Sequence, residues 1–573
     1  MRTRPERPSP ACLKKLPLLP SGVPLFSVLA CTLWAQPVMA MEIGYNPDWM
    51  IRWDNTFRHI VGVRTQGVDD DIAYDPRFDE SDYKFSDSGD IVTNRSSLLS
   101  ELDISYKGKF GARVSGSVWK DFAYDDKVET APEFAALGSS YDNDRYSHYT
   151  ERFYVEGAEL LDAFAFANIP IGDRTLSLKV GQQTQYWGIS LFQGFHSISY
   201  SQSPLNLGKS LATPGSDLSE LFLPREQVYM QIPLTRDLTL AAQYFYGWDS
   251  NRFPEGGTYL GFIDFMFKGP DQWPLVAPGT PGFPNGYAAR RSPSYEPDNN
   301  NNNHGVSLRW SPDFLAGTVG AYYRRMDETQ PWAPIAVLDP VFMVPASYHS
   351  SYNQGVDLVG LSIDKQIGDL SVGAEMSYRH NTALNSSAIA TPGTDGSMGA
   401  TGDSFHMVVN ALAGLEPTAF YDTGSASVEV AWGRLLDVND NEHLYRGEGY
   451  DGCPVGDDKW DGCSTRDVIN VAARFEPQWL QAAPGLDLSA PVSATWGAYG
   501  TGATLSGGFQ GSVVYSAGIS ATLYRNYTFS LSYAGYQYRQ KDIDATPGYT
   551  SKGNGYYFLN DRDWVSLSFE ASF

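Results

Sequence analysis

The chain has 573 residues and a formal net charge of −24, with 66 Asp and Glu against 42 Lys and Arg. Such an acidic balance argues against binding to nucleic acid, and against docking on anionic lipid through basic patches. The 35 Tyr, 29 Phe, 14 Trp and 55 Gly favour many strands over helices. Beyond the N-terminal region, no run approaches the roughly 20 apolar residues of a membrane-spanning helix.

Residues 1–40 have the pattern of a bacterial secretory signal. Five basic residues precede or flank an apolar run at 16–35, and Val38 and Ala40 occupy the small-residue positions of a cleavage site. A membrane anchor fits less well because prolines break the apolar run. A lipoprotein signal at Cys31 is less favoured because Leu29 fits poorly beside that cysteine. We expect export and removal of this segment. It carries five basic residues and one acidic residue, so the rest of the chain has a net charge of −28.

Segments of strict alternation follow along the chain, each about as long as a tilted strand that crosses a bilayer. The segment at 98–106 places Leu, Ile and Tyr on one face and acidic residues on the other. After a tight turn, the segment at 110–122 repeats the pattern, as do those at 369–379 and 527–533. A helical period of 3.6 fits none of them, so these segments predict strands.

Short and long connections alternate between these segments, as in a transmembrane barrel with short periplasmic turns and long outside loops. We therefore predict that residues 41–573 form one all-β domain, a transmembrane antiparallel β-barrel of the Gram-negative outer membrane with about 16–18 strands. The expected short turns lie near 107–109, 169–173, 233–237, 311–315, 366–368, 413–423 and 524–526. The expected long extracellular loops lie at 66–95, 125–150, 186–224, 249–303, 326–353, 381–402, 437–465 and 541–562.

Inward positions of the predicted strands carry charged side chains, which would hydrate or cross-link the wall of a wide barrel. An excess of carboxylates there would disfavour anionic solutes. The candidate lumen-lining residues are Glu101, Asp103, Arg113, Arg324, Glu375, Arg379, Glu429 and Glu570.

Two stretches in the predicted outside loops are apolar, at 257–267 and 331–347, and a third, at 188–224, is mixed but rich in Leu and Phe. Contiguous apolar surface usually marks an interaction site. These loops could fold inward as a plug, collect a lipophilic compound, or only cap the barrel. We take the loop at 186–224 as the candidate plug or gate. The candidate gate or lipophile-contact residues are Phe192, Phe195, Leu205, Leu207, Trp332, Phe342 and Met343.

The loops offer few other chemical sites. Cys453 and Cys463 are spaced for a disulfide in an oxidising compartment, and a zinc site would need more ligands than lie nearby. Acidic stretches at 68–75 and 457–462 lack the spacing of an EF-hand, so solvated loops are favoured over calcium sites. There is no G-x-S-x-G motif, which leaves His406 as the best candidate base of a hydrolase. We expect no enzyme, cofactor or metal.

The chain ends in "DRDWVSLSFEASF", where apolar residues occupy every second position. In a barrel, that face would meet outer-membrane lipid while the serines and Glu570 face a wet interior. A plain buried strand could show the same alternation. The ending is similar to the recognition signal of the outer-membrane barrel assembly machinery. The candidate signal residues are Val565, Leu567, Phe569 and Phe573.

Several motifs together resemble a proteobacterial family filed as domain of unknown function 1302. They include Tyr186-Trp187-Gly188, Pro204-Leu205 and Pro214-Gly215, with "DLSAPVSATWGAYGTG" at 487–502 and "WMIRWDNTFRHIVGVRT" near the start. The resemblance implies an outer-membrane barrel that handles sterols, long-chain acyl compounds or other lipophiles. It also implies a periplasmic lipid-carrier-like partner and an RND-type inner-membrane permease. No catalytic residues can be carried over from the family.

From these patterns we expect an outer-membrane channel or transporter for hydrophobic or amphipathic compounds. A general or cation-preferring porin is the first alternative, and a structural or adhesive barrel is the second. A barrel-embedded hydrolase is the third, and it would depend on a single Ser or on a residue such as His406.

Overall fold

A computed structural model describes residues 41–42, 46, 48–69, 72, 75–216, 218–332, 335–339, 343–387, 398–541 and 553–573. All of these belong to one compact unit, Ala40–Phe573. The expected signal segment, 1–40, lies outside the described residues.

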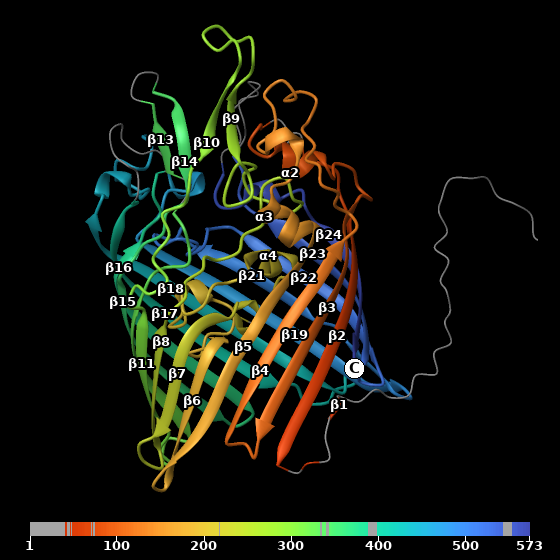
Figure 1. Ribbon diagram of the computed structural model, residues 1–573, viewed down its shortest axis with the longest axis vertical. Coiled ribbons are helices and arrows are strands. Elements are labelled where there is room, and N and C mark those ends of the chain that lie inside the picture. Colours follow the sequence, from red (N-terminus) through yellow and green to blue (C-terminus); the bar gives the residue numbers. More distant parts are fainter. Residues whose placement is uncertain are drawn as a thin grey trace, which may run out of the picture. The chain divides into compact units, whose positions relative to one another are not determined.

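The described chain forms a closed antiparallel β-barrel, as predicted (Figure 1). Each strand pairs with the next along the chain, and the last strand pairs with the first long strand over Thr56–Arg64 and Trp564–Ser572. Eighteen strand positions surround the interior, because β20 and β21 together fill one position between β19 and β22. The count lies at the upper end of the predicted range.

The wall strands are β2 (Trp49–Arg64), β3 (Ile91–Tyr106), β4 (Phe110–Asp121), β5 (Glu156–Ile171), β6 (Arg174–Gln183), β7 (Arg225–Pro233), β8 (Leu238–Phe245), β11 (His304–Trp310), β12 (Gly317–Met326), β15 (Val356–Ile367), β16 (Leu370–Ala383), β17 (Thr401–Gly414), β18 (Thr423–Asp440), β19 (Asp467–Ala483), β20 (Leu486–Ser489), β21 (Val492–Tyr499), β22 (Val513–Leu523), β23 (Tyr527–Gln537) and β24 (Trp564–Ser572). A two-residue strand, β1 (Met41–Glu42), pairs beside β2.

The connections carry a second, four-stranded sheet of β9 (Gln272–Val276), β10 (Tyr287–Arg291), β13 (Ile335–Leu338) and β14 (Pro345–His349). They also carry short helical turns: α2 (Asp79–Tyr83), η1 (Asp142–Asp144), α3 (His148–Thr150), η2 (Glu151–Val155), η3 (Gly194–His196), α4 (Leu207–Ala212), α5 (Leu218–Leu221), η4 (Glu442–Leu444), η5 (Lys459–Asp461) and η6 (Tyr557–Leu559). Among the described residues, no helix is long and apolar enough to cross a bilayer.

Long loops gather at one end of the barrel and tight turns at the other, as the sequence predicted (Figure 1). Two connections were not predicted: the turn between β19 and β20, and the loop at 500–512 between β21 and β22. Both flank residues 486–499, where Pro491 lies between β20 and β21 and interrupts the wall strand. A proline cannot donate to a ladder, so a break there is expected.

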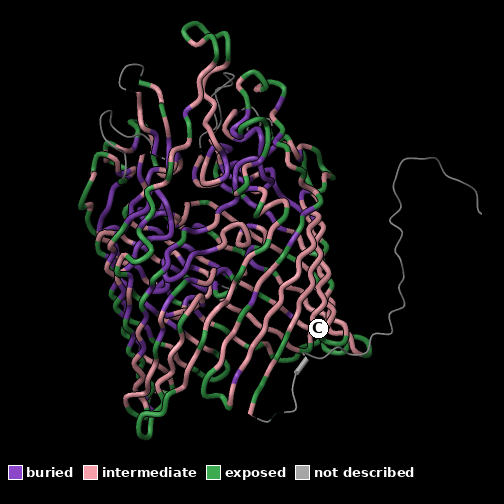
Figure 2. Tube along the Cα trace, in the orientation of Figure 1, coloured by how far each residue is buried: buried purple, intermediate pink, exposed green. Residues whose placement is uncertain are grey.

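Figure 2 shows how burial varies along the wall strands, and on β15 and β16 buried and exposed residues alternate. On β15, Leu361 is 50 % exposed, whereas its neighbour Ser362 is buried. On β24, Leu567 is 57 % exposed, and the buried Trp564 marks the opposite face. An apolar exterior around a closed sheet is the arrangement that a lipid environment requires, since closing the ring pairs the first and last strands and leaves neither as a free edge.

Aromatic side chains pack at the long-loop end into what we call the rim cluster. It is built from loops that are far apart in sequence. Its members include Phe78, Phe253, Tyr259, Phe262, Tyr557, Phe558 and Trp564. Because Tyr259 and Phe262 belong to this cluster, the apolar stretch at 257–267 packs largely within the molecule.

The predicted Cys453–Cys463 disulfide is present in the loop between β18 and β19.

Candidate functional site

A segment that we call the plug, residues 187–203, crosses the interior of the barrel. Two buried carboxylates of the wall, Glu429 on β18 and Glu375 on β16, accept hydrogen bonds from its backbone. The donors to Glu429 are the N–H groups of Leu191, Phe192 and Gln193 at 2.6–2.8 Å. The donors to Glu375 are those of Ile189 and Ile198 at 2.6–2.8 Å. Charge-assisted bonds of this kind are among the stronger ones in proteins, so the plug is firmly attached.

Two buried arginines of the wall hold the carbonyl groups of the same segment. Arg324 on β12 donates to the carbonyl oxygens of Ile198 (2.8 Å) and Tyr200 (2.7 Å). Arg379 on β16 donates to those of Phe195 and Ser197, both at 3.0 Å. The wall thus meets plug donors with carboxylates and plug acceptors with guanidinium groups. Four of the charged residues predicted to line the lumen lie here.

His406 on β17 also belongs to this contact. Its Nδ1 lies 2.9 Å from Nδ1 of His196 in the plug, and its Nε2 lies 3.0 Å from Oγ of Ser404. Within the described residues, no carboxylate bonds to either histidine, and the adjoining cavity holds only about 10 Å³. Ser404, His406 and His196 thus form one chain of contacts from the wall to the plug. Here His406 holds the plug.

Glycines make the room that the plug occupies. Gly188 has a φ of +96°, and a Cβ there would lie 2.4 Å from Oε2 of Glu375. On the wall, a Cβ at Gly360 or Gly373 would lie 2.8 Å or 2.7 Å from an isoleucine side chain of the plug. Glycine within a strand often marks the close approach of another chain segment. Gly360 and Gly373 within predicted strands could therefore have indicated that another segment packs against the wall, which the sequence analysis did not recognise.

The predicted gate residues lie in different surroundings. Phe195 and Leu205 pack against α5, and Leu207 lies at the start of α4 beside the rim cluster. Trp332 is buried in the loops, where its Nε1–H donates to the carbonyl of Leu384. Phe192 is half-buried in the plug, and Met343 is exposed. Phe342 lies outside the described residues. The structure therefore does not gather these residues into one surface.

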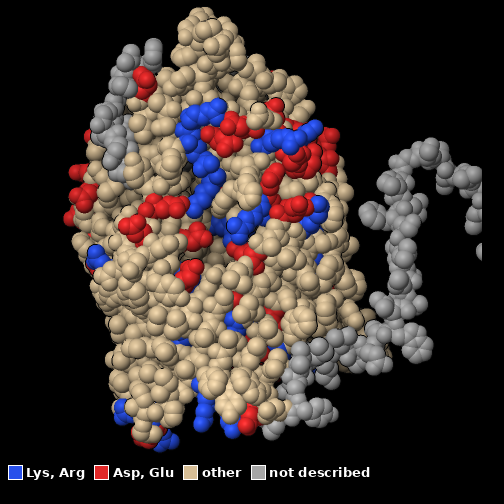
Figure 3. Space-filling model, in the orientation of Figure 1, with Lys and Arg blue, Asp and Glu red and all other residues tan. Residues whose placement is uncertain are grey.

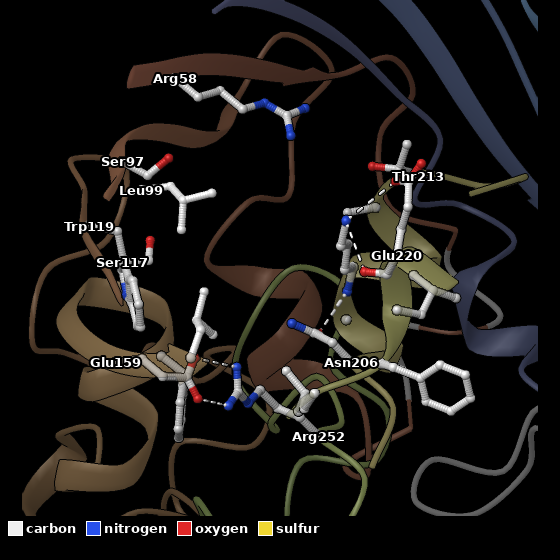
Figure 4. Close-up of a pocket in the computed structure, with 18 of the residues that line it drawn as sticks. Arg58, Ser97, Leu99, Ser117, Trp119, Glu159, Asn206, Thr213, Glu220 and Arg252 are labelled. Atoms are coloured by element: carbon white, nitrogen blue, oxygen red, sulfur yellow. Dashed lines mark hydrogen bonds and ion pairs between the residues drawn. The ribbon is translucent and has the colours of Figure 1, made fainter. Parts of the chain in front are cut away.

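Beside the plug lies a cavity of about 840 Å³, which we call the wall cavity (Figure 4). Its walls are strands β2–β6 on one side and the stretch containing α4 and α5 on the other. Apolar side chains contribute much of the surface, among them Leu99, Trp119, Leu221 and Phe222. The volume lies within the range of sites that hold small organic molecules.

Charged side chains of both signs line the wall cavity, six cationic against five acidic. Most are paired. Arg113 joins Glu101, Asp103 (3.0 Å) and Asp162 (3.1 Å), which brings together three of the predicted lumen residues. Within this cavity, cationic and acidic side chains are therefore nearly balanced.

Three cations of the wall cavity, Arg58, Arg95 and Lys179, form no ion pair within 4 Å among the described residues. Arg95 instead donates to the carbonyl of Phe153 and lies against the ring of Trp119. Arg58 on β2 extends into the open space (Figure 4). It is registered opposite Glu570, the eighth predicted lumen residue, but no ion pair joins them. Lys179 on β6 lies 5.3 Å from the ring centroid of Phe164. The side chains of Arg58 and Lys179 are available to an acid group of a ligand.

Buried carboxylates also meet in the rim, and we call Asp79, Glu80 and Asp264 the rim carboxylates. Asp264 accepts the N–H groups of Glu80 (2.9 Å) and Ser81 (3.1 Å). Burial is the main cause that raises the pKa of Asp79 to about 8 and of Asp264 to about 7. Burial, and then the charge of Asp264, raises the pKa of Glu80. The neighbouring Arg562 donates to Asp82 on the same turn.

No group of three metal-ligating side chains occurs among the described residues. The acidic stretch at 68–75 is only partly described. In the stretch at 457–462, Asp461 accepts from Nζ of Lys541 at 2.5 Å and closes a capping box with Asp458. These carboxylates already have protein partners.

Comparison with solved structures finds outer-membrane channels of low similarity. A BenF-like porin from Pseudomonas fluorescens Pf-5 aligns at 9 % identity with a TM-score of 0.38, covering 92 % of this chain and 99 % of that one. Acinetobacter baumannii OccAB1 aligns at 8 % identity and 0.41, covering 93 % and 98 %. Pseudomonas aeruginosa OpdK, solved with vanillate, aligns at 9 % and 0.38, covering 91 % and 98 %. These likenesses are loose, so the fold rests on the strand pairing of this chain.

A comparison with curated protein sequences found no match. The family resemblance read from the motifs is confirmed, because the pattern of a family described as "Protein of unknown function (DUF1302)" matches residues 22–573. The protein belongs to that family.

Proposed function

We propose that the protein is an outer-membrane channel for amphipathic compounds, with long-chain acyl acids as the favoured class. The observation that carries the proposal is the wall cavity, where an apolar surface adjoins Arg58 and Lys179, two cations that form no ion pair among the described residues and are not held by a backbone carbonyl as Arg95 is. An apolar chain can lie against the apolar surface while its acid group pairs with a cation. Ligand sites commonly combine apolar walls with a few such polar groups.

The apolar exterior and the closed ring support a place in a membrane, and the plug supports a conduit that is shut at rest. The family resemblance adds two further expectations to the proposal: a periplasmic lipid carrier and an RND-type permease as partners. A general porin is less well supported, because the plug crosses the lumen and is held by four buried charged residues.

Quenching of Trp119 fluorescence by bromostearate tests the ligand class, with the barrel in lipid nanodiscs. Trp119 lines the wall cavity, so the part of the signal lost in Trp119→Phe reports binding there. We expect saturable quenching, weakened about tenfold in Arg58→Gln and in Lys179→Gln because each loses one ion pair with the acid group. Arg309→Gln is the matched control, since Arg309 lies on β11 and does not line the cavity. Absence of saturable quenching in the wild type would reject the ligand class.

Planar-bilayer recording tests the channel. We expect the purified wild type to be closed, and deletion of residues 188–224 to open a steady conductance. A wide conductance in the wild type that the deletion does not change would favour the porin. No conductance in either protein, together with no quenching, would favour a structural or adhesive barrel.

A further inference from the structure

The wall of the barrel is uneven in height. β5 has 16 residues, but the next four wall strands have 10, 9, 8 and 7, before the wall rises again to 14 in β16. Tight turns join β5 to β6, β7 to β8 and β11 to β12, so these strands are level at the short-turn end. The missing length therefore lies towards the long loops. We call this gap the notch.

One side of the notch is a strand edge without a strand partner. β5 pairs with β4 as far as Glu156, but its pairing with β6 ends at Ala163. Side chains replace the missing strand at two carbonyl groups. Gln182 Nε2–H donates to the carbonyl of Leu160 at 3.1 Å, and Arg152 Nη2–H to that of Ala158 at 3.5 Å. An unpaired edge inside a membrane is tolerated where it borders a polar cavity.

The molecular surface is hollowed on this side. Above the ends of β6 and β7, Figure 3 shows a hollow with acidic and basic side chains around it. The wall cavity reaches the same edge, because Glu159 of β5 and Gln183 at the end of β6 both line it. The wall cavity and the surface hollow therefore meet at the same strand edge.

An ion pair spans the notch. Arg252, from the loop between β8 and β11, holds Glu159 with two hydrogen bonds, one of them at 3.1 Å. The two side chains are 14 % and 18 % exposed, and both line the wall cavity. The adjacent residue, Leu160, is 52 % exposed. At this edge, the charged Glu159 therefore faces the cavity, and the next residue, the apolar Leu160, is exposed on the outside.

On the long-loop side, the wall cavity is covered. Tyr259 and Trp564 line it and belong to the rim cluster. An acyl chain that left through the loops would enter water. Each methylene group exposed in this way makes the equilibrium between cavity and water about fourfold less favourable to release. A route through the notch leads instead from the cavity to the apolar exterior.

We propose that the notch is a lateral portal, through which the acyl chain of a bound amphiphile passes between the wall cavity and the membrane. The Arg252–Glu159 pair holds the portal closed. This inference rests on the proposed function, since it takes the ligand class from there.

The test follows the rate at which bromostearate, preloaded in the bilayer of the nanodisc, quenches the Trp119-specific signal. Arg252→Glu places like charges across the notch, and we expect a rate at least threefold above that of the wild type. The swap Glu159→Arg with Arg252→Glu restores the pair with its signs reversed, and we expect the wild-type rate. Arg434→Glu is the control, because it breaks a wall ion pair with Asp467 that does not line the cavity.

The outcomes separate the two proposals. No quenching in the wild type rejects the ligand class and the portal together. Quenching with the same rate in the wild type, Arg252→Glu and the swap rejects the portal alone. An equal rise in Arg434→Glu also rejects the portal, because the effect would then come from general loosening of the barrel. A rise confined to Arg252→Glu and reversed by the swap supports the portal.

Discussion

Glu429 accepts the backbone N–H of Leu191 at 2.6 Å, which links the barrel wall to a segment 238 residues earlier in the chain. The same carboxylate also accepts the side chain of Ser190. A buried carboxylate is costly unless several donors surround it, and here the donors come mostly from the plug backbone. The carboxylate and the plug therefore depend on each other: without the plug, Glu429 would keep only the side-chain amide of Asn410 on β17 among its described donors.

Glu429→Gln is expected to release part of the plug. An amide keeps one acceptor oxygen but turns an NH₂ group towards plug N–H donors, and each buried polar group left unpaired costs about 1–3 kcal/mol. We expect hydrogen exchange in residues 189–193 to rise at least tenfold, and brief channel openings to occur in bilayer recordings. Glu570→Gln is the matched control, since Glu570 lies on β24 and has no hydrogen bond or ion pair to the plug among the described residues. Unchanged exchange would mean that the remaining wall contacts suffice.

Gly188→Ala is expected to disturb the contact between the plug and Glu375 of the wall, here by a change in the plug itself. The new methyl group would meet the Glu375 carboxylate, and a φ of +96° is unfavourable for alanine. We expect destabilisation of the plug by about 2 kcal/mol or more, detected as faster exchange of the Ile189 and Ile198 amides. Gly414→Ala on β17 is the control, because a Cβ there would meet nothing within 4 Å. Equal effects of the two substitutions would contradict the role given to Gly188.

The barrel could be predicted from sequence because its signals are local. A two-residue period is visible within one strand, and the alternation of short and long connections is visible from neighbouring strands along the chain. The plug could not be predicted in the same way. Its wall residues, such as Glu375 and Arg379, stood out as charged positions, but their partners are backbone groups that any sequence supplies. The notch was also invisible, because it depends on strand ends, which are the least certain feature of a sequence-based reading.

The rim carboxylates are expected to make the long-loop end sensitive to pH. Their pKa values are raised above those of the unfolded chain, about 8 for Asp79 and about 7 for Asp264. The folded rim therefore binds more protons than the open one, so its stability falls as pH rises from about 4 and is lowest above about 8. The charged groups around the cluster, Asp82 and Arg562, pair with each other.

Hydrogen exchange in α2, corrected for the intrinsic effect of pH, measures this dependence. We expect protection to fall several-fold between pH 5.5 and pH 8.5. Glu80→Gln mimics the protonated acid, so it should reduce the slope while keeping the protection seen at low pH. A slope that stays the same in this variant would show that Glu80 does not contribute, and protection that rises with pH would contradict the assigned direction.

Phe573→Ala tests the predicted assembly signal separately from the stability of the finished barrel. The backbone of Phe573 pairs with that of Asn55 on β2 in both directions (2.8 and 2.9 Å), and alanine keeps those bonds. The ring itself is 42 % exposed on the outer face, so its loss should cost the folded barrel only about 1 kcal/mol. Phe529→Ala on β23 removes a ring of similar exposure, 47 %, away from the terminus.

We expect the two variants to refold equally well in lipid vesicles, as judged by a folded band in unheated gels. In cells, recognition of the terminal ring by the assembly machinery predicts a several-fold lower amount of folded barrel for Phe573→Ala and little change for Phe529→Ala. Equal losses in cells would mean that both rings act only through lipid contact. A loss for Phe573→Ala that also appears in vesicles would place the defect in the closing of β24 on β2, because vesicles contain no assembly machinery.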